Sequence, residues 1–416
     1  MIECIKLDNG IRLVLEPMMQ VESATVGFWF RTGAVDENAG NAGISHFTEH
    51  MMFKGTPTRE ASDIAKDMDA IGAQMNAFTG KETTCYYVKA TSENLLKAVD
   101  IMVDMLENSL FLKEEMDRER LVIGEEIKMT DDAPDELAHA TLVKKLFRGS
   151  HLSNSILGTV SSLKKISTIK MKNYVADNYV KHEMVISIAG GFDSASVYAF
   201  FQDKFKGMKD SKSDVRRNKA EDAPSFSMKK RDIKQAHICM GRRAISMDDP
   251  SRYAMKLLNN IIGGSMSSRL FQNIRETKGL AYSVCSGLVA FSDDGYFEIY
   301  AAVAQDKVGN AIRAIQEEII KLEDTHVSIE ELDASREQLK ASCAFERESS
   351  SARMSINGKN YLLLGHTVDQ DEIMNGYDAV TMSDLENVKE KICGLDKYSI
   401  SLVSGKKHEL RPYVIR

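Results

Sequence analysis

The segment His46-Phe47-Thr48-Glu49-His50 carries the most information in this chain of 416 residues. In an α-helix, positions i, i+3 and i+4 lie on one face, so two imidazoles and one carboxylate would point in the same direction. Neutral imidazoles are good zinc ligands, and a carboxylate beside them can accept a proton from water. The segment therefore predicts a helix that binds a metal ion.

The flanking residues support a helix at this position. Residues 41–43 and Ser45 are small or polar, as is typical of a helix start, and Lys54-Gly55 is typical of a helix end. Ile44, Phe47 and Met51 form an apolar stripe that can pack on the protein. The opposite face then has no evident structural role, although two His and one Glu can also occur at this spacing by chance. The order of these residues, His-x-x-Glu-His, is the inverted form of a zinc-peptidase motif.

A catalytic zinc site usually has three protein ligands and a water, so the third ligand must come from another segment. Residues 117–127 have the pattern of a long charged helix, in which Glu119 and Glu126 lie two turns apart on one face. One of them can bind the metal while the other accepts a hydrogen bond from a ligating imidazole. A solvated acidic helix face is the common alternative interpretation of the same residues.

The composition is that of a globular protein, with 43% hydrophobic and 28% charged residues, and the length suggests two or more domains. A net charge of −7 argues against nucleic acid as the main partner, because phosphate binding needs a basic surface. No segment resembles a membrane span or a targeting peptide. The six cysteines are scattered without a Cys-x-x-Cys pair, which favours buried thiols in a reducing compartment. We expect a cytoplasmic protein with no nucleic-acid or membrane partner.

The chain contains an internal repeat. In each half, a strand precedes a helix, a later strand runs into a helix, a glutamate-rich segment opens a long helix, and a final helix leads into a final strand. The segments of the first half are 25–30, 83–90, 93–106, 114–117, 166–179 and 184–188, and their counterparts are 237–241, 296–304, 307–322, 330–333, 380–392 and 398–402. Each half therefore predicts an α+β sandwich of sheet and helices.

We predict two tandem homologous domains, each a mainly antiparallel sheet covered by helices. They would span residues 1–212 and 227–416, with a polar linker at 213–226. The second copy keeps the scaffold but not the metal-binding residues, since it has no histidine in the segment 268–275. This difference favours a functional role for the polar residues of the first copy.

His-x-x-Glu-His followed by Glu-x6-Glu resembles the pitrilysin/insulinase zinc metallopeptidases. The likeness is to their short-chain branch, which includes the mitochondrial processing peptidase β subunit and bacterial processing-peptidase-like proteases. The resemblance implies that one Zn²⁺ per chain is bound by His46, His50 and Glu126, with Glu125 as the alternative to Glu126. It also implies that Glu49 is the general base and that Glu119 is the hydrogen-bond partner of a ligating histidine.

The resemblance covers nearly the whole chain. Asn76, Ala77, Phe78 and Thr79 resemble the substrate-binding edge strand of the family, and residues 263–271 resemble its glycine-rich loop and following helix. In the second half, an Arg/Tyr pair matches residues that the family places over the scissile bond; here the pair is Arg275 and Tyr282.

The motif and the resemblance together predict a zinc-dependent endopeptidase that binds its substrate as an added β-strand. The resemblance implies that the substrate is an unstructured peptide small enough to enter a closed chamber. Tyr282 would hydrogen-bond the developing oxyanion, and Arg275 would fix the substrate or the tyrosine. The family's long members carry four such units and this chain two, so the resemblance implies a homodimer whose active site is completed by the partner chain. The alternatives are a heteromer with a paralogue, a non-catalytic core-type subunit, and a protein that holds peptides without cutting them.

Overall fold

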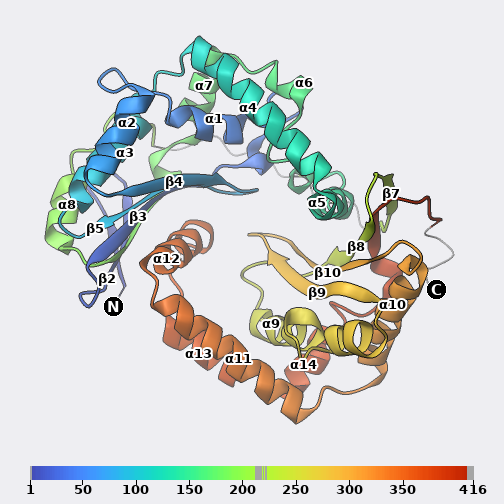
Figure 1. Ribbon diagram of the computed structural model, residues 1–416. Helices are drawn as coiled ribbons and strands as arrows, with labels where there is room; N and C mark the ends of the chain where they lie inside the picture. Colours follow the sequence, from blue (N-terminus) through green and yellow to red (C-terminus); the bar gives the residue numbers. More distant parts are fainter. Residues whose placement is uncertain (1, 211–217, 219, 221–222, 410–416) are drawn as a thin grey trace. The chain divides into compact units, whose positions relative to one another are not determined.

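The computed structural model describes residues 2–210, 218, 220 and 223–409, which form two compact units (Figure 1). Unit 1 comprises Met1–Ile127, Asn154–Arg217 and Ala344–Asp369, and unit 2 comprises Lys128–Ser153, Asn218–Cys343 and Gln370–Arg416. Each unit thus combines residues from both sides of the predicted domain boundary. The predicted linker at 213–226 lies largely outside the described residues.

Unit 1 is built on a six-stranded sheet in the order β1-β2-β6-β3-β5-β4. Neighbouring strands are antiparallel except for β2 and β6, which run parallel. This order leaves β4 at one edge of the sheet. The strands are β1 (Glu3–Lys6), β2 (Arg12–Pro17), β3 (Ser23–Phe30), β4 (Gln74–Thr79), β5 (Thr84–Thr91) and β6 (Met184–Gly190).

The central strand β3 is buried on both faces, and its alternation decides which core each side chain joins. Val26, Phe28 and Phe30 pack into the main core with the helices of the first half. These helices are α1 (Ile44–Met52), α2 (Ala61–Ala70), α3 (Leu95–Asn108), most of α4 (Lys113–Asp132), α6 (Val160–Leu163), α7 (Thr168–Asn178) and α8 (Ser194–Phe201).

The opposite face of this sheet is covered by α12 (Ser350–Leu364), a helix from the second half of the sequence (Figure 1). The helix approaches the sheet closely because glycines face the contact: a Cβ on Gly27 would lie 2.2 Å from the sulfur of Met354, and one on Gly358 would lie 2.3 Å from Trp29 Nε1. A largely buried ion pair between Arg353 and Glu16 adds a polar contact. This packing explains why unit 1 is discontinuous in sequence.

Unit 2 repeats the arrangement with a five-stranded sheet in the order β7-β11-β8-β10-β9. Only β7 and β11 run parallel. The strands are β7 (Phe226–Lys230), β8 (Gln235–Arg243), β9 (Ala281–Ala290), β10 (Gly295–Ala304) and β11 (Ser399–Ser404).

One face of the second sheet packs into a hydrophobic core with the helices of the second half. They are α9 (Arg252–Asn259), the π-helices η4 (Asn260–Gly264) and η5 (Phe271–Thr277), α10 (Val308–Asp324), α11 (Ile329–Arg347), α13 (Gln370–Asp378) and α14 (Met382–Lys389). The other face is covered by α5 (Pro134–Leu146), a helix from the first half of the sequence (Figure 1). A Cβ on Gly241 of β8 would lie 2.9 Å from Leu142 Cδ2, so a glycine again permits the close contact.

The remaining regular segments are single 3₁₀ turns: η1 (Ala34–Asp36), η2 (His151–Ser153), η3 (Lys181–Glu183) and η6 (Leu395–Lys397). The predicted fold class is confirmed, since each unit is a mainly antiparallel sheet with helices on both faces. Among the helices of the described residues, none has both the length and the apolar character needed to cross a bilayer.

Candidate active site

Helix α1 has the orientation that its sequence pattern predicts. Ile44, Phe47 and Met51 are fully or almost fully buried in the core of unit 1. His46 and His50 lie on the other side of the helix, with ring centroids 4.6 Å apart. The apolar stripe therefore anchors α1 on the core, and the polar face of the helix lies outside the core.

The start of α1 is held by a residue that the sequence analysis did not identify. The buried carboxylate of Glu37 accepts hydrogen bonds from the main-chain N–H groups of Gly43 (2.6 Å) and Ser45 (2.8 Å) and from the Ser45 hydroxyl (2.6 Å). It satisfies N–H groups that a helix start leaves unpaired. Burial raises the pKa of Glu37 to about 7, although these hydrogen bonds oppose the shift.

The predicted metal ligands converge on one point. His46 Nε2 lies 3.8 Å from Glu126 Oε2, and His50 Nε2 lies 3.6 Å from Glu126 Oε1. The three donor atoms all lie within 4.8 Å of one another. Glu126 comes from α4, so the docking of α4 beside α1 assembles the set.

These donors fit a zinc ion. The 3.6 and 3.8 Å separations are too long for hydrogen bonds, but they are near the spacing of about 3.3 Å between tetrahedral ligands with bonds of about 2.0–2.1 Å. Glu126 Oε2 is buried and has no hydrogen-bond partner among the described residues. Burial, and secondarily His50, lowers the pKa of His46 to about 4, so its imidazole is neutral at physiological pH, as metal binding requires.

Glu119, which lies on α4, orients the candidate ligand His50. Its carboxylate lies 2.9 Å from His50 Nδ1 and 2.6 Å from Lys54 Nζ. The hydrogen bond turns Nε2 of His50 toward Glu126 and favours the tautomer whose Nε2 lone pair can bind metal. Although burial acts in the opposite direction, the contacts with Lys54 and His50 lower the pKa of Glu119, which keeps it ionised.

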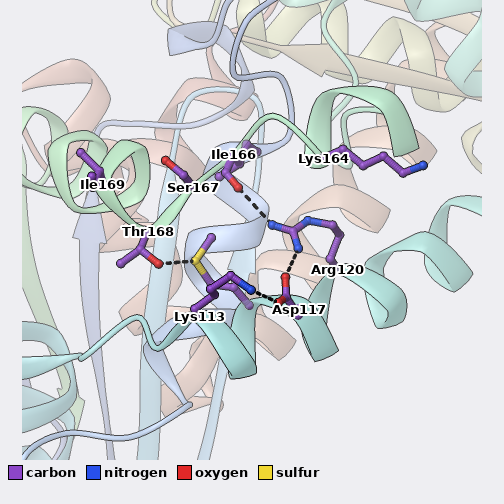
Figure 2. Close-up of a pocket in the computed structure, with 9 residues that line it drawn as sticks. Lys113, Asp117, Arg120, Lys164, Ile166, Ser167, Thr168 and Ile169 are labelled. Atoms are coloured by element: carbon purple, nitrogen blue, oxygen red, sulfur yellow. Dashed lines mark hydrogen bonds and ion pairs between the residues drawn. The ribbon is translucent and has the colours of Figure 1, made fainter.

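Arg120 fixes α4 against the rest of unit 1. Its guanidinium donates to the carbonyls of Leu163 (3.1 Å) and Ile166 (3.0 Å), and it lies over the ring of Phe47 in α1. Figure 2 shows this arginine at the wall of a pocket that contains none of the predicted site residues. The contacts hold the helix that carries Glu119 and Glu126 in place.

The predicted base Glu49 and the predicted substrate strand meet directly. The hydroxyl of Thr79, the last residue of β4, donates to Glu49 Oε2 at 2.5 Å. Burial, together with the nearby charge of Glu126, raises the pKa of Glu49, whereas the Thr79 hydrogen bond and His50 oppose the shift. A carboxylate with a raised pKa is a better proton acceptor near neutral pH.

Strand β4 has the properties of an accessible edge. The N–H of Ala77 donates to the Asn76 side chain at 2.8 Å, so this N–H points away from the neighbouring strand β5. By the alternation of an antiparallel pair, the main-chain groups of Met75 and Thr79 point the same way. Phe78 is partly exposed and packs edge-on against Trp29.

Arg275 and Tyr282 belong to unit 2, whereas the candidate ligands belong to unit 1. Arg275 lies in η5, with its guanidinium over the ring of Phe271 and 3.7 Å from Glu276. Tyr282 lies near the start of β9 and is 75% exposed. The side chain of Tyr282 is therefore available to a ligand, and its role stays a prediction.

The hydroxyl of Thr79 gives a pH-dependence prediction. Because its hydrogen bond stabilises ionised Glu49, Thr79→Val should raise the pKa of Glu49 further and move the acidic limb of the kcat/KM profile to higher pH. On the acidic limb kcat/KM should fall roughly tenfold at a given pH, the equivalent of a charge-assisted hydrogen bond of about 1.5 kcal/mol. Thr79→Ser keeps the hydroxyl and should keep the wild-type profile. An unchanged acidic limb in the valine variant would contradict the assignment.

Comparison with known proteins relates both halves of the chain to one peptidase family. Residues 12–160 match the insulinase family (peptidase family M16), and residues 165–339 match the peptidase M16 inactive domain. An uncharacterized zinc protease of Bacillus subtilis, YmxG, is 38% identical over 97% of this chain and 98% of its own length. One of Streptomyces coelicolor is 33% identical over 93% of this chain and 86% of its own.

A solved structure shares the fold. The chain titled peptidase M16 inactive domain from Pseudomonas fluorescens superposes with a TM-score of 0.91 at 17% identity, covering 98% of this chain and 99% of that one. The fold, the family matches over both halves and the named relatives agree with the motif on α1. The chain belongs to the insulinase family, peptidase family M16, and is a zinc metalloprotease.

Proposed function

We propose that this metalloprotease is an endopeptidase that cleaves unstructured peptides bound as an extra strand along β4. The observation that carries the proposal is the hydrogen bond between Thr79 and Glu49, which joins the edge strand to the polar face of α1. A peptide paired with β4 would therefore pass beside the base and the candidate metal ligands.

His46, His50 and Glu126 would hold one catalytic zinc ion, which supplies Lewis-acid polarisation of the attacking water and the scissile carbonyl. Glu49 accepts a proton from the attacking water and later delivers it to the leaving amine. Glu119 keeps the imidazole of His50 in the ligating orientation.

Pairing through the main chain gives affinity with little selectivity for the side chains of the substrate. Asn76, Ala77, Phe78 and Thr79 would bind the substrate backbone, and the side chain of Asn76 must release the Ala77 N–H when substrate pairs there. We therefore expect loose sequence preference. A closed chamber would add a strict limit on size, so that flexible peptides are cut and folded proteins of ordinary size are spared.

The chelator experiment tests the proposed activity. Purified protein is incubated with a library of unstructured peptides, with and without a chelator, and the products are sequenced. We expect internal cleavage that stops with the chelator and returns with added Zn²⁺. Peptide binding without cleavage would instead indicate a peptide-holding protein, and absence of both would indicate a core-type subunit. Internal cleavage of a stably folded substrate would contradict the closed chamber.

We also propose a homodimer in which Arg275 and Tyr282 of one chain complete the zinc site of the other. In that arrangement Tyr282 donates to the developing oxyanion and Arg275 fixes the substrate or the tyrosine. Each chain contains both the candidate zinc site and the Arg275/Tyr282 pair, so a two-fold symmetric dimer would contain two complete sites. The proposed location is the cytoplasm, in line with the scattered cysteines.

A mixing experiment tests the dimer. Inactive Glu49→Gln is combined with inactive Tyr282→Phe under conditions of proven subunit exchange. If sites form between chains, some mixed dimers pair an intact Glu49 with an intact Tyr282, and activity should return. No recovery, or a fully active monomer, would contradict the shared site.

A further inference from the structure

A second cluster of metal-binding side chains lies in unit 2, on the face of the sheet that α5 covers. Cys239 of β8 pairs with Tyr300 of β10, and Glu298 stands two residues before Tyr300, so Cys239 and Glu298 share that face. His139 of α5 reaches the same place, with its Nδ1 3.0 Å from Glu298 Oε2. One donor atom from each of His139, Cys239 and Glu298 lies within 4.8 Å of the others.

The surroundings hold these donors in place. Cys239 is fully buried, and the side chains of Glu298 and His139 are 13% and 35% exposed. The ring of Tyr300 stacks on His139 at 5.2 Å, and its hydroxyl lies 2.8 Å from Nδ1 of His237. These contacts hold the His139 ring near the cluster.

The donor types suit a cation. In the metal-free protein the mostly buried carboxylate of Glu298 has His139 as its partner, with Nδ1 3.0 Å from Oε2. A divalent ion would neutralise one thiolate and one carboxylate together, and binding would release the thiol proton.

We propose that His139, Cys239 and Glu298 bind a second divalent metal ion of the zinc class, separate from the catalytic site. Thiolate, imidazole and carboxylate together match Zn²⁺, whereas Mg²⁺ and Ca²⁺ prefer oxygen ligands alone. Three protein donors leave a fourth position for water, which the partial exposure of His139 can admit.

The ion would join three segments that are far apart in sequence. α5 contributes His139, β8 contributes Cys239 and β10 contributes Glu298. Binding to the folded form alone stabilises that form, so bound metal should raise the unfolding temperature of unit 2. The proposed ion would therefore stabilise the fold of unit 2, and the proposal does not depend on the proposed peptide substrate.

Cobalt substitution gives the test, because the candidate catalytic ligands include no thiolate. A His46→Ala/His50→Ala variant of the full chain removes catalytic binding, and the metal-free protein is titrated with Co²⁺. We expect a thiolate-to-cobalt charge-transfer band in the near ultraviolet that saturates at one ion per chain. Zn²⁺ should displace the cobalt and raise the unfolding temperature.

Matched variants in the same background decide the assignment. Cys239→Ser should abolish the band. Cys285→Ser should leave it intact; this control changes the cysteine of β9 that pairs with Tyr300. His139→Gln should weaken cobalt binding at least tenfold and serves as the test if the serine variant does not fold, as checked by circular dichroism. Absence of the band in folded protein, or a band that survives Cys239→Ser or His139→Gln unchanged, would overturn the proposal.

Discussion

Glu49→Gln should abolish peptide hydrolysis while leaving the zinc content of the protein unchanged. The amide keeps the shape of the carboxylate and can still contact Thr79, but it cannot accept a proton from the attacking water. A general base contributes about 10²–10⁴-fold to the rate, so kcat/KM should fall by at least this factor. The measurement is kcat/KM on a fluorogenic peptide, with metal content determined by mass spectrometry on the same samples.

Two comparisons make the Glu49 result specific. Glu125→Gln, an exposed glutamate of α4, should leave both activity and zinc content unchanged. Unfolding temperatures of all variants control for stability, since Glu49 is partly buried. Turnover by Glu49→Gln at the wild-type rate would show that another group is the base.

Glu126→Gln should cause the largest loss of zinc affinity among substitutions in α4. The change removes the negative charge of the candidate ligand that faces Nε2 of both His46 and His50. Glu119→Gln changes the partner of His50 Nδ1 and of Lys54 Nζ but no candidate ligand, and losing such a partner of a ligating histidine costs about 10–100-fold in metal affinity. We expect Glu126→Gln to exceed that range, with a matching loss of activity at limiting zinc.

The measurement is the zinc dissociation constant, determined by competition with a chromogenic chelator. To keep the two proposed zinc sites apart, the series is made in the Cys239→Ser background. The expected order of loss is Glu126→Gln, then Glu119→Gln, with Glu125→Gln near wild type. If Glu125→Gln lost zinc and Glu126→Gln kept it, the alternative ligand from the sequence analysis would be correct.

Much of this molecule follows from local sequence pattern. The stripe of Ile44, Phe47 and Met51 predicts both the helix and its buried side, because one apolar face of a 3.6-residue period must pack inward. The internal repeat predicts corresponding strands and helices in the two halves, although it does not identify α5 or α12. The polar face of α1 that carries His46, Glu49 and His50 was therefore predictable, whereas the roles proposed for Glu126, Arg275 and Tyr282 come from the resemblance to insulinase-type peptidases.

Other features depend on which distant segments come together. Glu37 holds the start of α1 from a preceding loop, with no helical spacing to reveal it. Glu125 and Glu126 are alike in sequence, and only the docking of α4 leaves one exposed and brings the other to the histidines. The same holds for the approach of His139 to Glu298, which needs α5 to cover the second sheet. Local pattern determines the elements because their hydrogen bonds and apolar faces are local, whereas side-chain contacts between elements are decided by tertiary packing.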